Sequence, residues 1–308
     1  MADPDPFAPH RPALFALAYR LLGSASEAED VLQDAYLRYA TAAPDVIRSH
    51  KAYLSTIITR LCLDRLKAAH TRREQYIGPW LPEPLLTRDE GDDPQHQAER
   101  HESITLAFLV VLHSLTPPER AAFVLHEVFE YPHADVAAML GLSAANCRQL
   151  FHRAKVRLAA GRPRVQPSSA ARQQHLVASF LAAAEQGDVT TLATLLADDV
   201  TFWADSGGKT PAPRRPVQGR TAVAALLPVF VANTLRLVDG DRSALRSAVA
   251  EVNGEPAILL WLRERLDSVT VCSLQDAQIT ALRLVRNPEK LDYIRRQLRA
   301  KSDASPNV

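Results

Sequence analysis

Two stretches of this sequence are rich in arginine and lysine and contain almost no acidic residues. The first holds Arg60, Arg65, Lys67, Arg72 and Arg73, and the second holds Arg148, Arg153, Lys155, Arg157, Arg162 and Arg164. Such side chains attract the phosphate backbone of nucleic acids and give binding that weakens with salt. Either stretch alone could equally be the solvated face of a helix, so the surrounding residues decide.

The second basic stretch follows a pattern typical of a helix-turn-helix. We expect a short helix over 134–140, a turn at Gly141, and a longer helix capped by Ser143 that runs to Leu158. The apolar residues of this pattern form an inner corner. The outward face would then carry Ala145, Asn146, Arg148, Gln149, His152 and Arg153. Arginine, asparagine and glutamine can make bidentate contacts to base edges in a major groove.

Acidic residues near the predicted strands of the last third could instead do acid–base chemistry. Asp198, Asp199, Asp205 and Glu251 are the candidates, with Trp203 as a possible pocket wall. No spacing fixes a histidine–aspartate pair among them. The run Gly207-Gly208-Lys209 lacks the pattern of a phosphate-binding P-loop. These acids therefore indicate an enzyme only weakly.

Length and composition limit the classes of protein to which this chain can belong. A chain of 308 residues is long enough for two or three domains. No apolar run approaches the ~20 residues that span a bilayer, and residues 1–11 lack the basic start and apolar core of a secretory signal. Cys62, Cys147 and Cys272 are widely spaced and odd in number, which favours buried free thiols. We therefore expect a cytoplasmic protein without a metal or cofactor.

Residues 12–75 predict a helical bundle. Apolar residues at helical spacing form a first helix that ends at Gly23. Ser26 is the expected N-cap of a second helix, which Pro44 breaks. A third helix over 51–71 buries its leucines and isoleucines and turns its arginines outward.

Residues 76–97 are rich in proline and acidic residues, which indicates an extended linker. Its run Gly-Pro-Trp-Leu-Pro-Glu-Pro, from Gly78 to Pro84, is unusually apolar for a flexible tether. We therefore expect Trp80 and Leu81 to dock on another surface. A second linker over 161–169 follows the helix-turn-helix.

After residue 170 the pattern changes to mixed short elements. Helices are expected over 171–186, 189–196, 220–233 and 288–299, and strands over 200–203, 244–252, 256–263, 268–272 and 279–285. Two or three helices against a curved antiparallel sheet make an α+β domain.

Two segments resemble a known family. The run Leu14–Gly23 followed by Glu27–Arg38 resembles region 2 of extracytoplasmic-function (ECF) sigma factors. The run Leu115–Leu125, with the helix-turn-helix after it, resembles region 4. The run Trp80–Pro84 and the C-terminal domain are similar to the SigJ-like subgroup, whose members carry a fused SnoaL-like domain.

Two further runs are similar to motifs of that subgroup. Asp205–Lys209 has Ser206 where a glycine is usual, and Asn287–Leu291 has Glu289 in place of aspartate. Both runs keep their charges. The resemblance therefore covers nearly the whole chain.

The resemblance implies a multidomain fold with two all-α sigma domains, a region 2 helical bundle and a region 4 helix-turn-helix, plus a C-terminal α+β cone of the SnoaL-like, nuclear-transport-factor-like type. The expected boundaries are 1–75 for region 2, 76–101 for the linker, 102–161 for region 4, 162–170 for a second linker, 171–300 for the SnoaL-like domain and 301–308 for a polar tail.

The resemblance also implies a function and the residues for it. The chain would be an alternative sigma factor, not an enzyme, that binds core RNA polymerase and directs initiation at −35/−10 promoters. Polymerase would be bound by Asp30, Gln33, Asp34 and Arg38. The −10 element would be contacted by Arg48, Ser49, His50, Lys51, Arg60, Arg65, Lys67, Arg72 and Arg73. The −35 element would be contacted by Asn146, Arg148, Gln149, Arg153, Lys155 and Arg157.

The C-terminal domain is expected to regulate this activity in cis through the linker. Its contacts would join Trp80, Leu81, Pro82, Glu83 and Pro84 to Asp205, Gly207, Gly208 and Lys209 and to Asn287, Pro288, Glu289, Lys290 and Leu291. A small-molecule ligand in a C-terminal pocket could bias that packing.

Two other functions remain open from the sequence. One is a helix-turn-helix regulator that acts without core polymerase, although such a protein has no need of a region 2. The other is a SnoaL-like cyclase or isomerase with a DNA-binding leader, which would need a pocket holding a perturbed acid.

Overall fold

The computed structural model describes residues 7–42, 47, 49–74, 76–87, 105–159 and 170–304. The chain divides into two compact units, Met1–Gln75 with Phe108–Arg162, and Tyr76–Ala107 with Pro163–Val308. The start of the predicted linker, from Tyr76 onward, is thus part of the second unit. Arg48 and the side chains of Arg72 and Arg73 lie outside the described residues.

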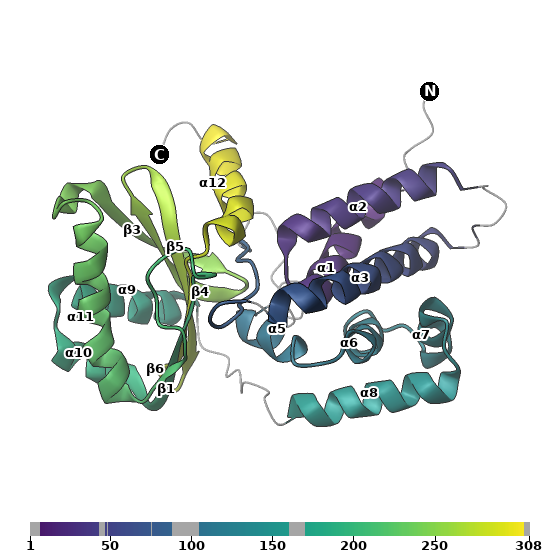
Figure 1. The fold of residues 1–308 in the computed structure, drawn as a ribbon, viewed down its shortest axis with the longest axis horizontal. Coiled ribbons are helices and arrows are strands. Elements are labelled where there is room, and N and C mark those ends of the chain that lie inside the picture. The colour runs from purple at the N-terminus through teal and green to yellow at the C-terminus, as the bar shows by residue number, and fades with distance from the viewer. Residues whose placement is uncertain are drawn as a thin grey trace. The chain divides into compact units, whose positions relative to one another are not determined.

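The described part of the first unit is helical (Figure 1). Its helices are α1 (Arg11–Leu22), α2 (Ala25–Ala40), α3 (His50–Glu74), α6 (Pro117–Phe123), α7 (His133–Leu140) and α8 (Ala144–Ala159), with short helical turns at Ala8–His10 and Val124–Val128. A further helix, α5 (Leu106–Leu112), begins in the second unit and continues into the first. The bundle before the linker and the helix-turn-helix are both confirmed.

The core of α1, α2 and α3 is built from aliphatic side chains. Leu17, Leu21, Val31, Leu54 and Ile58 are each 0% exposed. Each such side chain contributes about 1.5–3 kcal/mol by leaving water. This burial fixes which faces of α2 and α3 remain outside.

The predicted N-cap of α2 is wrong by two residues. The helix begins at Ala25, and Ser24 Oγ accepts a hydrogen bond from the Glu27 backbone N–H at 3.1 Å. Ser24 can cap because its backbone is extended after the turn at Gly23. Ser26 lies inside the first helical turn.

The second unit is built on one six-stranded sheet with the order β2-β1-β6-β5-β4-β3. The strands are β1 (Leu196–Asp205), β2 (Val217–Gln218), β3 (Leu245–Val252), β4 (Glu255–Leu262), β5 (Arg265–Gln275) and β6 (Gln278–Val285). The expectation of a wholly antiparallel sheet is wrong for one pair, because β1 runs parallel to β6. The long connection after β1 contains a helix, and a crossover of that length is what a parallel pair needs.

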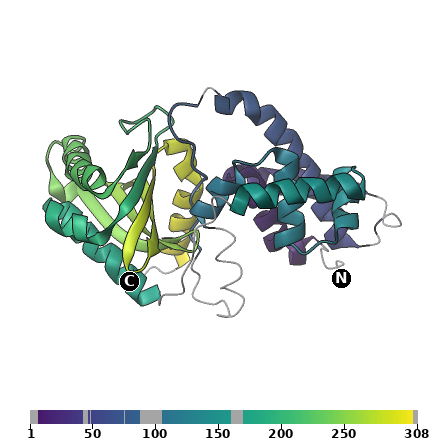
Figure 2. The same cartoon turned by 90° about the horizontal axis from the view of Figure 1, so that it is seen from below.

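Helices cover both faces of this sheet. α9 (Ala170–Gln186), α10 (Val189–Leu195) and α11 (Arg220–Arg236) lie on one side, and α12 (Asp292–Ala304) lies on the other (Figures 1 and 2). Short 3-10 turns at Arg242–Ala244 and Pro288–Leu291 precede β3 and α12. The expected α+β domain is therefore confirmed as a mixed sheet with helices on both sides.

Candidate nucleic-acid interface and linker clamp

The outward face of α8 carries the polar residues that the sequence placed there. Ser143 Oγ accepts from the Asn146 backbone N–H at 3.2 Å and caps the helix. Asn146, Arg148 and Gln149 are exposed. A shallow hollow on this face is lined by Ala145, Arg148, Gln149, His152 and Arg153. The face thus presents donors and acceptors of the types that read base edges.

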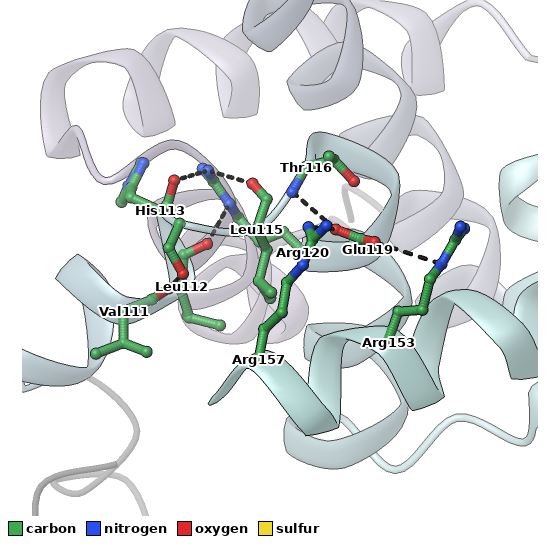
Figure 3. A network of polar contacts seen from close by, with 10 residues as sticks. Val111, Leu112, His113, Leu115, Thr116, Glu119, Arg120, Arg153 and Arg157 are labelled. Atoms are coloured by element: carbon green, nitrogen blue, oxygen red, sulfur yellow. Dashed lines mark hydrogen bonds and ion pairs between the residues drawn. The ribbon is translucent and has the colours of Figure 1, made fainter. Parts of the chain in front are cut away.

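The remaining basic residues of α8 are held by acids of the same unit (Figure 3). Glu119, buried at the start of α6, accepts from Arg157 at 2.6 Å and lies 3.5 Å from Arg153. Lys155 lies 3.7 Å from Glu127. The sequence did not reveal these pairs, because the partners are separated by more than a helix length along the chain. They orient Arg153 and Arg157 at the C-terminal half of α8.

A stacked pair of histidines packs against α8. The rings of His126 and His133 are 3.8 Å apart between centroids, and Phe151 of α8 meets them edge-on at 4.7 and 5.2 Å. Burial, with the nearby charges of His126 and Arg148, lowers the pKa of His133. The neutral form of His133 is therefore favoured at this contact.

The predicted −10 residues divide into separate environments. Ser49 Oγ accepts from the Ala52 backbone N–H at 3.4 Å, and His50 Nδ1 lies 2.8 Å from the Tyr39 hydroxyl. Lys67 is exposed beside Asp64. Arg65 instead faces α2, where it donates to Asp34 at 2.8 Å and lies 3.6 Å from Asp30.

The α2 surface carries the predicted polymerase-binding residues on its outer side. Asp30, Gln33 and Arg38 are exposed, and Asp34 is half-buried by its bond to Arg65. Sequence reasoning did not single out Tyr36 and Leu37, which are 43% and 64% exposed on the same helix. Exposed apolar side chains among charges are typical of a protein-binding surface.

Within the first unit, α3 contacts the helix-turn-helix. Ser55 Oγ lies 3.0 Å from the Tyr131 hydroxyl, and Arg60 Nε donates to the Met139 carbonyl at 3.3 Å. Lys51 lies over the Tyr131 ring, 5.7 Å from its centroid. Two predicted −10 contacts, Lys51 and Arg60, therefore touch region 4 residues in this arrangement.

The buried Arg120 of α6 hydrogen-bonds to the backbone just before α6 (Figure 3) and also to α1. Arg120 is 2% exposed and donates to the carbonyls of Leu112, His113 and Leu115 at 3.0 to 3.4 Å. It also donates to the Leu21 carbonyl of α1 at 2.6 Å. One guanidinium therefore donates hydrogen bonds to four carbonyl oxygens.

In the second unit, the start of the linker binds the end of β1. Asp205 is 0% exposed, and its carboxylate accepts from the Tyr76 hydroxyl and from the Leu81 backbone N–H, the latter at 2.7 Å. Asn287 Nδ2 donates to the Tyr76 hydroxyl at 2.9 Å. Burial, together with the charge of Asp205 and its hydrogen bond, raises the pKa of Tyr76. Tyr76 therefore remains a neutral donor.

Lys290 also takes part in the contact between the linker and Asp205. Its ammonium lies 2.6 Å from Asp205 Oδ2 and donates to the Leu81 carbonyl. It also lies over the Trp80 ring, 4.1 Å from the centroid, a cation–π geometry. We call the set Tyr76, Trp80, Leu81, Asp205, Asn287 and Lys290 the linker clamp.

Two glycines allow the linker to approach this closely. Gly207 and Gly208 both have positive φ, at 58° and 74°. A Cβ on Gly207 would lie 2.6 Å from Asn287 Nδ2, and one on Gly208 would lie 2.9 Å from Ile77 Cδ1. A side chain at either position would push the linker away. Lys209 beside them forms an exposed ion pair with Glu289.

The other predicted linker residues lie in the same contact. Leu81, Pro82, Glu83 and Pro84 are buried, as is Leu291, and Pro288 starts the 3-10 turn that carries Lys290. Trp80 is partly exposed beside the Lys290 ammonium. The structure thus brings the three predicted runs together.

Further anchors of the linker were not predicted. Leu85 N–H donates to Asn253 Oδ1 at 3.0 Å, and Leu85 O accepts from the Asn253 N–H at 2.8 Å. Thr87 Oγ1 donates to Glu251 at 3.1 Å. At the other end of the segment, Glu255 accepts from the Leu106 N–H at 2.9 Å. Tyr76, Asn253 and Glu255 carry no sequence motif that would have marked them.

The four acids considered for catalysis lie outside the apolar cavity of the second unit. Asp198 pairs with Arg220 at the surface, while Asp205 and Glu251 bind the linker. None of the four acids, nor Trp203, lines the apolar cavity of the second unit.

In the part of the chain that the structure describes, no group of three or more histidine, cysteine or acidic residues could hold a metal ion. The described cysteines are buried free thiols, as expected. No described helix combines the length and apolar character of a membrane span.

Comparison with known proteins places these features in a family. The Sigma-70 region 2 model matches residues 7–72, and the Sigma-70 region 4 model matches residues 105–158. The ECF RNA polymerase sigma factor SigJ of Mycobacterium tuberculosis is 38% identical over 91% of this chain and 90% of its own length. The probable ECF sigma factor SigI of the same species is 30% identical over 94% of each chain.

A solved structure supports the same family assignment. The crystal structure of Mycobacterium tuberculosis SigJ superposes with a TM-score of 0.71 at 34% identity, covering 92% of this chain and 96% of that chain. The likeness therefore extends through the C-terminal α+β domain.

Proposed function

This chain belongs to the ECF RNA polymerase sigma factor family, and we propose that its C-terminal domain controls its activity through the linker clamp. As a member of that family it is an alternative sigma factor, not an enzyme, that binds core RNA polymerase and promoter DNA to direct transcription initiation. The observation that carries the proposal is the buried Asp205–Lys290 pair closed around Leu81.

Each predicted interface receives a role in this proposal. The exposed face of α2, including Tyr36 and Leu37, docks on core polymerase. The N-terminal half of α8 enters the major groove at the −35 element with Asn146, Arg148 and Gln149. Ser49, His50 and the basic side of α3 contact the −10 element. Lys51 and Arg60 are exposed, and they would give up their contacts with Tyr131 and with the Met139 carbonyl to bind DNA.

The clamp would set the distance between the two DNA-reading modules. The linker is bound at Tyr76–Leu81 and at Leu85–Thr87, and the chain after it is bound at Leu106, the first residue of α5. With both ends held on one domain, the modules on either side lose the freedom of a random tether. The proposed domain boundaries therefore keep 76–101 as a separate functional segment, whose described part, residues 76–87, is bound to the domain at 171–300.

The proposal also includes the compartment in which the protein acts and a ligand that acts on the clamp. The protein acts in the cytoplasm, where core polymerase is. A small-molecule ligand in the C-terminal domain biases the clamp, because two strands that wall its cavity lead to clamp residues: β1 ends at Asp205, and Asn287 follows the end of β6 by two residues.

Arg148→Ala tests the assignment of α8. Loss of a base contact costs about 1–3 kcal/mol, so promoter binding by the reconstituted holoenzyme should weaken about 5- to 150-fold. The loss should fall on promoters with the native −35 element and be small on scrambled ones. Val156→Ala, at a 60% exposed position of the same helix, is the matched control. An equal loss on both promoters would show that Arg148 only contacts phosphates.

A further inference from the structure

The second unit contains a partly open apolar cavity of about 130 Å³. Its walls come from the sheet and from α9 and α11, and include Phe180, Phe202, Leu227, Phe230, Ile258 and Leu284. Protein interiors are normally packed with few voids larger than a water molecule. An apolar space of this size between side chains is therefore unusual in a domain core.

A polar group on the wall is left without a partner. Thr234 of α11 lines the cavity and is 2% exposed. Among the residues that the structure describes, nothing hydrogen-bonds its Oγ1. A helical threonine commonly donates to the carbonyl one turn back, and Thr234 does not. A buried hydroxyl without a partner is unfavourable, which points to a ligand atom that satisfies it.

The remaining walls limit the charge of the ligand. No lysine, arginine or histidine lines the cavity. Glu185, at its exposed edge, accepts from Ser247 Oγ at 2.7 Å. Ser268 and Thr270 add hydroxyls to an otherwise apolar lining. An ion would be costly to bury here, so the occupant is uncharged.

We propose that this cavity binds an uncharged molecule about the size of a substituted benzene, with one hydroxyl or carbonyl that hydrogen-bonds to Thr234. A dry apolar cavity of ~150 Å³ accepts benzene, which sets the size. This assignment names the ligand class for the small molecule of the proposed function, and it rests on that proposal only for the effect on transcription.

The cavity is connected to the linker clamp through its walls. Phe202 of β1 and Leu284 of β6 each lie three residues before a clamp residue, Asp205 and Asn287. The Arg286 guanidinium lies over the Phe230 ring, 5.2 Å from its centroid. The backbone N–H groups of Arg286 and Asn287 both donate to the Asp205 carbonyl, at 2.7 and 2.9 Å. A ligand that moves Phe230 or β6 therefore acts on the clamp directly.

The test is calorimetric and NMR-detected binding of phenol and toluene to the full chain. Both should bind saturably to one site. Thr234→Val keeps the shape and removes the hydroxyl, so phenol should bind about three- to tenfold more weakly while toluene is unchanged. Thr221→Val, at an exposed threonine of the same helix, should change neither. Ala184→Leu, which fills the cavity, should weaken both at least tenfold.

The outcomes of these binding measurements test whether the cavity is a ligand site, separately from whether its ligand affects transcription. The inference is overturned if neither probe binds saturably, or if Thr234→Val leaves the phenol affinity unchanged. Thr234→Val decides the matter even if Ala184→Leu does not fold. If phenol binds as described but does not change transcription, the site stands and the regulatory role of the ligand in the proposed function fails.

Discussion

Asp205→Ala is expected to destabilise the second unit by about 3–5 kcal/mol, because it leaves the Lys290 ammonium buried without its counter-charge. The Tyr76 hydroxyl and the Leu81 N–H also lose their acceptor. The linker should therefore detach as the domain loosens. Hydrogen exchange of the full chain would measure both effects, with the Leu81 and Leu85 amides reporting the linker.

Glu289→Ala is the matched control for Asp205→Ala. It removes the acid of the neighbouring Lys209–Glu289 pair, whose side chains are 42% and 75% exposed. Exposed pairs contribute little to stability, so no change is expected. The double variant Asp205→Ala with Lys290→Met should recover only part of the lost stability, since no buried charge remains but the Leu81 N–H still lacks its acceptor. Equal effects of Asp205→Ala and Glu289→Ala would contradict the buried-pair account.

Arg120→Met should be similarly severe in the first unit. The buried guanidinium serves four carbonyls, and methionine fills part of its volume without donating. The Leu112 carbonyl keeps the Leu115 N–H as a donor, but the loss of four charge-assisted hydrogen bonds at a buried site should still cost about 3–5 kcal/mol. Thermal unfolding and limited proteolysis between α1 and α6 would detect the loss.

Arg11→Ala serves as the control for Arg120→Met. Arg11 forms a surface ion pair with Glu29, and its side chain is 54% exposed. This substitution should leave the unfolding transition where it is. If Arg120→Met does the same, the four hydrogen bonds of Arg120 do not hold the modules together.

The parts that the sequence predicts well depend on local patterns. The outward face of α8 follows from helical spacing around Cys147 and Leu150, which are both buried. The docking of Trp80 and Leu81 follows from apolar residues in a proline-rich segment. Both arguments need only a few neighbouring residues, and both agree with the structure.

The parts that it misses depend on contacts between distant residues. Tyr76 meets Asp205 across 129 positions, and Glu255 meets Leu106 across 149. The pairing of Arg153 and Arg157 with Glu119 and the parallel pairing of β1 with β6 are of the same kind. Nothing in the spacing of one sequence encodes such partners. The cap of α2 was missed for a different reason, since Ser24 and Ser26 are equally good caps by residue type.

The most direct test of the central claim is in vitro transcription with bacterial core polymerase on the gene's own upstream promoter. It compares the full chain with Trp80→Ala and with versions ending near Gly161 and near Arg286. We predict initiation that depends on the protein, and a changed level with Trp80→Ala while both flanking units stay folded, because Lys290 loses one of its two aromatic partners, Trp80 and Tyr76. Unchanged activity for Trp80→Ala and both truncations would contradict control through the linker clamp.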